Sequence, residues 1–219
     1  MIVIILCNSI YYSNATNSAD ILQSYLEPYI GLSDYRIEFT TQMGDTTNFY
    51  SGDSIDIRIS KRGDSIYIDQ GTFEILQDAT DLIFVNHLMQ GIYYTPLVEK
   101  NLNNIGTNFF QNPLGIFNSI MQDTLSLEVE DQSSEKVFIL NLNTNQPKIY
   151  FSKVKLYFNS SGEIIKSIYF QKNDSRVITY FYRTFLSGEN IDNTLFDKSK
   201  FIIGGQVSPS YSTYTLEKM

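Results

Sequence analysis

The sequence predicts a mainly β fold of the α+β class in a single domain, and two observations carry that prediction. The aromatic residues are 16 Tyr and 15 Phe with no Trp, and Tyr and Phe are enriched on the half-buried surfaces of sheets. Short segments of alternating apolar and polar residues also recur at roughly ten-residue spacing, which is typical of an antiparallel meander. The chain of 219 residues shows no linker and no internal repeat, and it is long enough for one sizeable core.

The expected strands, about ten in number, fill most of the chain. Residues 55–60 (IDIRIS) show the cleanest alternation, and a turn at 61–64 leads into the next strand. The other strand-like segments are 35–40, 65–69, 73–76, 81–85, 91–94, 125–129, 136–141, 148–158, 163–171 and 177–186. Residues 164–170 and 178–182 are apolar or aromatic in both phases, so either both faces of this part of the sheet are covered or one face lines an enclosed interior.

Two segments depart from the strand pattern. Ser18–Glu27 predicts a helix, because its apolar residues recur on one helical face before Pro28 and Gly31 end it. Residues 96–122 show no alternation and are broken by Pro113 and by glycines, which favours one or two short helices or turns. Connections of this length are often lids or binding loops, although ordinary core packing under a long loop remains an equal alternative.

The N-terminus predicts an export signal. An apolar run, Met1–Cys7, is too short to span a bilayer and is followed by small polar residues, so we expect residues 1–19 to be a signal peptide cleaved after Ala15 or Ala19. The alternative is a buried first strand, because no basic residue precedes the apolar run. Cleavage would remove Cys7, the one cysteine, and leave a mature chain of residues 20–219 without disulfides.

Charge and motifs exclude several function classes. A net charge of −8 argues against binding to nucleic acid or to anionic membranes. The single histidine, His87, is expected to be a solvated loop residue, and no Gly-x-Ser-x-Gly or His-Glu-x-x-His motif is present. Glu128 and Glu130 share a strand face and are expected to be solvent-exposed residues of an edge strand. The sequence thus predicts no catalytic residue, no metal and no cofactor.

The order of elements is similar to a known family. The segments that carry the likeness are DYRIEFTT (34–41), QDATDLIFV (77–85), NPLGIF (112–117), KLYFNSSGEIIKSI (155–168) and DNTLF (192–196), after the leading helix. Over about residues 18 to 200 this resembles the LolA/LolB-like carriers of outer-membrane lipoproteins. The chain departs from that pattern in lacking Trp, in offering no clear lid-latching arginine at Arg36 or Arg58, and in its tail, residues 204–219, which has no counterpart.

The resemblance implies an incomplete antiparallel β-barrel with a helical lid, here Leu97–Met121 joined by the helix at Ser18–Glu27, and a periplasmic carrier whose cavity holds an acyl chain or another apolar ligand. The implied partners are lipoprotein acyl chains and transport proteins of the inner and outer membranes. The residues expected to face the cavity are Ile37, Phe39, Ile57, Phe84, Tyr94, Phe109, Phe110, Leu114, Phe117 and Ile120. The alternative is a non-catalytic envelope interaction module on the same scaffold, with a filled interior and an exposed apolar patch.

Overall fold

The computed structural model describes residues 18–96, 115–132, 134–145, 150–188 and 191–218. These residues form two compact units: the first holds 18–31, 41–54 and the described part of 115–182, and the second holds 32–40, 55–96 and the described part of 183–218. Two long strands, β1 (Asp34–Asp45) and β11 (Arg176–Ser187), have residues in both units. The chain passes between the units several times.

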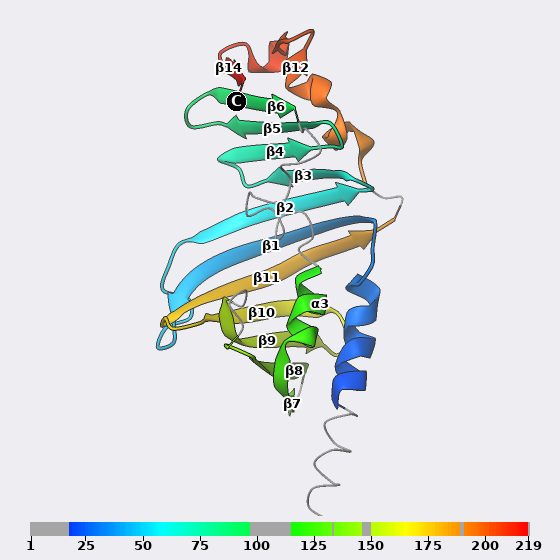
Figure 1. Ribbon diagram of the computed structural model, residues 1–219, viewed down its shortest axis with the longest axis vertical. Helices are drawn as coiled ribbons and strands as arrows, with labels where there is room; N and C mark the ends of the chain where they lie inside the picture. Colours follow the sequence, from blue (N-terminus) through cyan, green and yellow to red (C-terminus); the bar gives the residue numbers. More distant parts are fainter. Residues whose placement is uncertain (1–17, 97–114, 133, 146–149, 189–190, 219) are drawn as a thin grey trace, which may run out of the picture. The chain divides into compact units, whose positions relative to one another are not determined.

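The first unit is an antiparallel sheet with helices (Figure 1). Its strands follow the hydrogen-bonded order β1-β11-β10-β9-β8-β7. The strands that belong to it alone are β7 (Thr124–Gln132), β8 (Glu135–Leu142), β9 (Phe151–Asn159) and β10 (Ile164–Gln171). A helix at residues 18–26 continues into the 3-10 turn η1 (Glu27–Tyr29), which confirms the predicted helix, and α3 (Gly115–Gln122) precedes β7. Glu128 and Glu130 are exposed on β7, the edge strand, as predicted.

Aromatic side chains cover both faces of the sheet in the first unit. The ring of Tyr25, from the first helix, lies 5.0 Å from the ring of Phe158 and 5.4 Å from that of Phe138. On the loop after β1, the ring of Phe49 lies 5.7 Å from the ring of Phe170. The register of β9 and β10 places Phe158 and Phe170 on opposite faces. Here both faces are covered, which is the first of the two alternatives that the doubly apolar strands left open.

The second unit is a sheet in the order β14-β6-β5-β4-β3-β2-β1-β11. Its own strands are β2 (Ser54–Arg62), β3 (Ser65–Asp69), β4 (Phe73–Gln77), β5 (Asp81–Asn86), β6 (Gly91–Pro96) and β14 (Thr215–Lys218). Neighbours from β2 to β6 pair antiparallel, as the meander predicted. The pairing of β14 with β6 is parallel, which the sequence did not predict.

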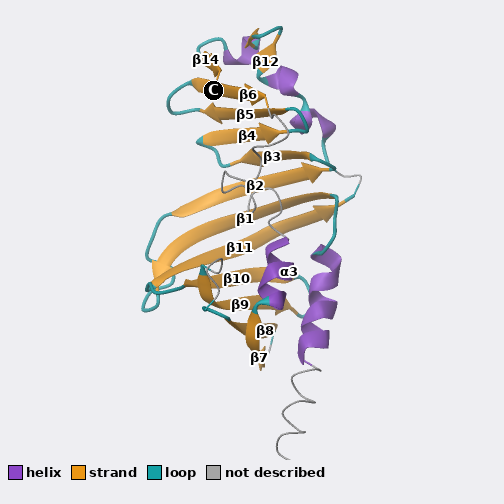
Figure 2. Cartoon of the chain, viewed as in Figure 1, coloured by secondary structure: helices purple, strands orange, loops and turns teal. Residues whose placement is uncertain are grey.

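Residues 191–218, which we call the C-terminal segment, are built from short elements of the second unit (Figure 2). They are η2 (Asn193–Phe196), η3 (Lys198–Lys200), β12 (Ile202–Ile203), β13 (Gln206–Val207), η4 (Pro209–Tyr211) and β14. Gly204 and Gly205 join β12 to β13 with φ of 57° and 79°. Two successive positive φ angles are what a two-residue hairpin turn requires, and glycine adopts them without a steric cost.

The mainly β fold predicted from the sequence is confirmed, and every expected strand is present. Strand β1 is longer than expected and extends to Asp45. The predicted signal peptide lies outside the described residues except at 18–19, where the first helix begins, and the predicted lid lies outside them apart from Pro96 and α3. None of the helices in the described ranges is both long and apolar enough to cross a membrane.

Candidate ligand-binding site

The structure divides the predicted cavity residues between the two units. Phe117 and Ile120 lie three residues apart on α3 in the first unit, and both are buried. Those in the second unit are Ile37, Phe39, Ile57, Phe84 and Tyr94. The remaining three, Phe109, Phe110 and Leu114, lie outside the described residues. The site is therefore built here from the second unit alone.

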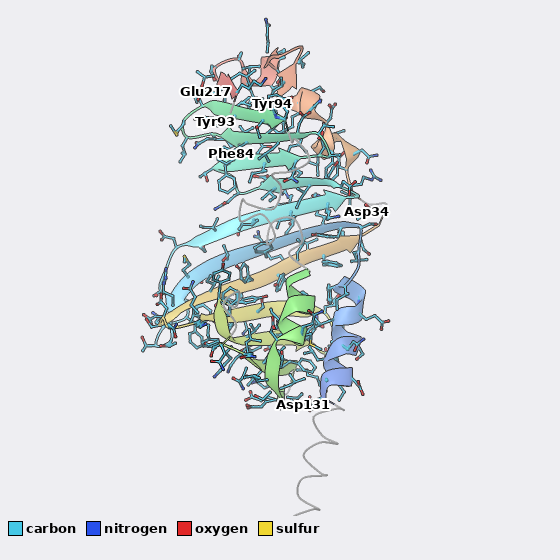
Figure 3. All side chains as sticks on the ribbon, viewed as in Figure 1. Asp34, Phe84, Tyr93, Tyr94, Asp131 and Glu217 are labelled. Carbon is cyan, nitrogen blue, oxygen red and sulfur yellow. The ribbon has the colours of Figure 1, made fainter. Side chains whose placement is uncertain are left out.

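Strand register separates two of the predicted residues within that unit. Ile83 lies opposite Tyr94, and Phe84 lies opposite Tyr93. Figure 3 labels Phe84, Tyr93 and Tyr94. Residues opposite one another in an antiparallel pair point to the same face, whereas neighbours along a strand point to opposite faces. Phe84 and Tyr94 thus lie on opposite faces of the sheet, which corrects the prediction that they line one wall.

One face carries an apolar row across five strands. Each member lies opposite the next in the strand register, and the row consists of Ile59, Ile68, Ile75, Phe84 and Tyr93. Ile57 precedes Ile59 by two residues and so points to the same face. Ile59 and Ile68 are buried, whereas Phe84 and Tyr93 are half-buried with their ring centroids 6.0 Å apart.

An ion pair places Ile37 and Phe39 on the face of the apolar row. The Glu38 carboxylate lies 3.1 Å from the Arg58 guanidinium, so these two side chains share a face. Arg58 lies between Ile57 and Ile59 and points away from them. Ile37 and Phe39 flank Glu38 and therefore point to the face of the apolar row. Four of the five predicted residues in this unit thus share one face, and Tyr94 is the exception.

The opposite face packs against the C-terminal segment. The buried core on this side consists of Tyr67, Leu76, Ile83, Val85 and Ile92 from the sheet and Phe201 from the segment. Leu195, Phe196 and Leu216 pack against it from the same segment. The C-terminal segment therefore closes one side of the sheet, and Leu216 contributes to this closure from the tail, residues 204–219, that had no counterpart in the family pattern.

A buried carboxylate fastens the middle of the segment to the sheet. Glu74 is 7% exposed, and its oxygens accept hydrogen bonds from Lys200 Nζ (2.5 Å), from the hydroxyl of Tyr211 (2.8 Å) and from the hydroxyl of Tyr67. Burial alone would raise the pKa of Glu74, but the hydrogen bonds from Lys200, Tyr67 and Tyr211 outweigh burial and hold the pKa below its ordinary value. Glu74 is therefore a charged, fully partnered anchor.

His87 belongs to the same cluster. Its Nε2 lies 3.0 Å from a Glu74 oxygen, and its Nδ1 lies 2.9 Å from the hydroxyl of Tyr214 in the C-terminal segment. The side chain is only 27% exposed. The expectation of a solvated loop histidine is wrong, because both ring nitrogens link the sheet to the segment.

A second carboxylate fastens the start of the segment. Asp81 is 7% exposed, and it accepts hydrogen bonds of 2.7 Å from both the Tyr94 hydroxyl and Lys198 Nζ. Burial acts to raise the pKa of Asp81, and the hydrogen bonds from Lys198, Tyr94 and Thr80 overcome that effect and lower it. The hydroxyl of Tyr94 is thereby held in a hydrogen bond to Asp81.

A cavity of about 370 Å³ lies between the sheet and the C-terminal segment. Its lining is largely apolar and consists of Ile83, Tyr94, Lys198, Ile202, Gly204, Gly205, Leu216 and Lys218. The parallel pairing of β14 with β6, in which Lys218 lies opposite Tyr94, holds Leu216 and Lys218 against the sheet. One predicted ligand-facing residue, Tyr94, therefore lines a cavity, but on the face opposite to the one expected.

Sequence reasoning missed the two anchors and the segment they hold. The signal for the anchors was present, because Glu74 shares its strand phase with Leu76, and Asp81 shares its phase with Ile83 and Val85. A charge on an apolar phase is expected to have a buried partner. In the part of the chain that the structure describes, no group of three or more His, Cys, Asp or Glu side chains is placed to hold a metal ion.

Comparison with known proteins gives structural neighbours only. No protein-family model and no curated protein matches the sequence. An uncharacterized conserved protein from Thermus thermophilus is similar in structure at 7% sequence identity, with 92% of this chain and 99% of that chain covered and a TM-score of 0.46.

Two further neighbours have names that agree with the resemblance predicted from the sequence. A LolA superfamily protein from Nitrosomonas europaea is 12% identical, with 82% and 98% of the two chains covered and a TM-score of 0.36. A putative outer-membrane lipoprotein-sorting protein domain from Vibrio parahaemolyticus is also 12% identical, with 84% and 97% covered and a TM-score of 0.33. These are likenesses of chain trace, and the functional argument rests on the residues of this chain.

Proposed function

We propose that this protein is a non-catalytic binding protein of the cell envelope that carries an acyl moiety of a lipoprotein or another apolar ligand. The observation that carries the proposal is the cavity of about 370 Å³ lined by Ile83, Tyr94, Ile202 and Leu216. Small-molecule sites are concave, mainly apolar and on the order of 300–1,000 Å³. The hydroxyl of Tyr94 is taken up by Asp81, so this side chain presents its ring to a ligand.

The expected affinity suits a carrier that must release its cargo. Burial contributes about 0.8 kcal/mol per methylene, so eight methylenes contribute roughly 6 kcal/mol gross. That figure corresponds to a dissociation constant of about tens of micromolar, before the cost of ordering the chain is subtracted. A carrier with this affinity exchanges ligand readily.

Binding of a neutral fluorescent probe, N-phenyl-1-naphthylamine, tests the proposal. Leu216→Trp adds bulk to the cavity wall and is expected to weaken binding, whereas the matched variant Leu125→Trp changes a leucine that is 69% exposed on β7 of the first unit and is expected to bind as the parent does. Equal affinities for the two variants would show that the probe binds elsewhere. Far-ultraviolet circular dichroism confirms that both variants are folded.

Export belongs to the same proposal. We propose that the chain is a periplasmic protein whose signal peptide, residues 1–19, is cleaved after Ala15 or Ala19, because a short apolar run precedes small residues. N-terminal sequencing of protein from an envelope fraction tests this step. An intact Met1 on protein recovered from the soluble cytoplasm would contradict it.

A second candidate is the envelope interaction module, and one observation favours it. Leu88 and Met89, in the turn between β5 and β6, are 80% and 70% exposed. No Asp, Glu, Lys or Arg occurs from residue 82 to residue 98, around this turn. Two adjacent apolar side chains exposed on one turn are a candidate contact site for a partner, and the two functions are separable because this turn does not line the cavity.

A further inference from the structure

The charged side chains that line the cavity are all cationic. The charged side chains in its lining are Lys198 and Lys218, and no acidic residue lines it. This bias runs against the chain as a whole, in which 24 acidic residues outnumber 16 basic ones. A cavity with an apolar wall and a cationic border fits a ligand that has an apolar part and an anionic group.

The two lysines are not equivalent. Lys198 Nζ is 2.7 Å from an Asp81 oxygen, which neutralises its charge, although an ammonium group has three donors and one contact leaves others free. Lys218 is exposed, and none of the ion pairs among the described residues includes it. Lys218 therefore supplies the charge that is left for a ligand.

The register of β14 fixes where that charge lies. Lys218 lies opposite Tyr94 in the parallel pairing with β6, and Leu216 lies two residues earlier on the same strand. The three side chains line the cavity together, so a cationic group stands beside an apolar wall. Asp81 is already paired with Lys198, so the carboxylate of Asp81 does not take up the charge of Lys218.

We propose that the cavity binds single-chain anionic amphiphiles, with the anionic head at Lys218 and the alkyl chain against Ile83, Tyr94 and Leu216. This inference rests on the proposed function and adds the chemical class of the ligand. The chain supplies most of the affinity through burial, and the lysine selects the sign of the head group.

Four probes that separate head from chain test the inference by isothermal titration calorimetry at low salt and pH 8. Decanoate carries both the chain and the anionic head, decanol carries the chain alone, decyltrimethylammonium reverses the charge, and acetate carries the head alone. An exposed ion pair contributes up to about fivefold in affinity, so we expect decanoate to bind about threefold to fivefold more tightly than decanol. We expect the cation to bind most weakly of the three and acetate not to compete.

Charge reversal identifies the residue. Lys218→Glu replaces attraction by repulsion and is expected to weaken decanoate binding about tenfold while decanol binding changes less than about twofold. Lys172→Glu makes the same change of charge on a half-buried lysine of the first unit and is expected to leave both affinities as they are. High salt is expected to reduce the preference for decanoate, because it screens exposed charges.

Each outcome bears on one of the two proposals. Equal binding of decanoate and decanol, or an unchanged decanoate affinity in Lys218→Glu, would overturn the ligand class and leave the apolar binding function intact. Displacement of decanoate by an equal concentration of acetate would show a site that binds anions without regard to the alkyl chain, and it would overturn the proposal that the ligand is an amphiphile. Failure of decanoate and decanol alike to bind would overturn the proposed function of this cavity together with the inference.

Discussion

Replacement of Lys200 by methionine should loosen the C-terminal segment from its sheet. Lys200 Nζ lies 2.5 Å from Glu74, whose side chain is 9% exposed, while the lysine side chain is 36% exposed. Methionine keeps most of the apolar stem and removes the charge and the donor. The buried carboxylate then keeps the hydroxyls of Tyr67 and Tyr211 and loses its cation.

The magnitude follows from what Glu74 loses. Removing one partner of a buried ion pair costs about 3–5 kcal/mol, and a hydrogen bond to a charged group contributes about 1.5–3 kcal/mol. Because Lys200 is one-third exposed, we expect a loss near the lower of these ranges, about 2–3 kcal/mol. A second change, Glu74→Leu, made together with Lys200→Met should recover part of that loss, since no buried charge is then left unpaired.

Urea unfolding measures the change, and Lys136→Met is the matched control. Lys136 forms an ion pair of 3.1 Å with Asp131, which is 76% exposed, so its loss should cost at most about 1 kcal/mol. Amide hydrogen exchange of residues 191–218 shows whether the loss is local to the segment. If Lys200→Met costs no more than Lys136→Met, the cluster around Glu74 does not fasten the segment and the reasoning is refuted.

Three further predictions concern pH, the predicted lid and the exposed turn. Hydrogen bonds lower the pKa of Glu74 and Asp81 in the folded chain, so these two carboxylates stabilise the fold above their ordinary pKa and lose that effect as the pH falls through the lower, folded pKa. Amide protection of residues 191–218 should therefore decrease below about pH 4. Protection that increases on acidification would contradict this. If Phe117, which is buried on α3, belongs to a lid, Phe117→Asp should reduce ligand affinity sharply while circular dichroism keeps its β-sheet signal, whereas outright unfolding would make it a core residue. Serine at both Leu88 and Met89 should leave decanoate binding unchanged and abolish cross-linking to any envelope partner, and unaltered cross-linking would remove the observation behind the interaction module.

Strand positions were predictable from the sequence because alternation is a local property. Residues 55–60 alternate cleanly, and β2 occupies them. Alternation also gives the phase of Ile57 and Ile37, which do point to the same face of the second unit. The length of β1 was not predictable in this way, because its last residues, from Thr41 to Asp45, carry no apolar alternation.

The pairing of phases between strands could not be predicted. Phe84 and Tyr94 are both aromatic and both lie on strands that are apolar in two phases, so composition alone does not say which face each takes. The register of the β5–β6 hairpin decides it, and a shift of one residue would exchange the faces. The candidate site therefore lies on the face of Tyr94 and not on the face of Phe84, which carries most of the predicted residues of this unit.

The C-terminal segment was missed for a different physical reason. Its strands are two to four residues long, too short to display a period. Its attachment depends on non-local contacts, such as Lys198 with Asp81, which no window along the sequence contains. The cavity exists only where this segment meets the sheet, so a search by local pattern could not find it.

Methyl-resolved NMR during titration with a neutral apolar probe tests the central claim most directly, because it reports where a ligand lies. The account predicts that the methyl resonances of Ile83, Ile202 and Leu216, which line the cavity, shift with one dissociation constant, while those of Ile57 and Ile59, which lie on the face of the apolar row, do not. Shifts confined to Ile57 and Ile59, or no shifts at all, would contradict binding in the cavity beneath the C-terminal segment.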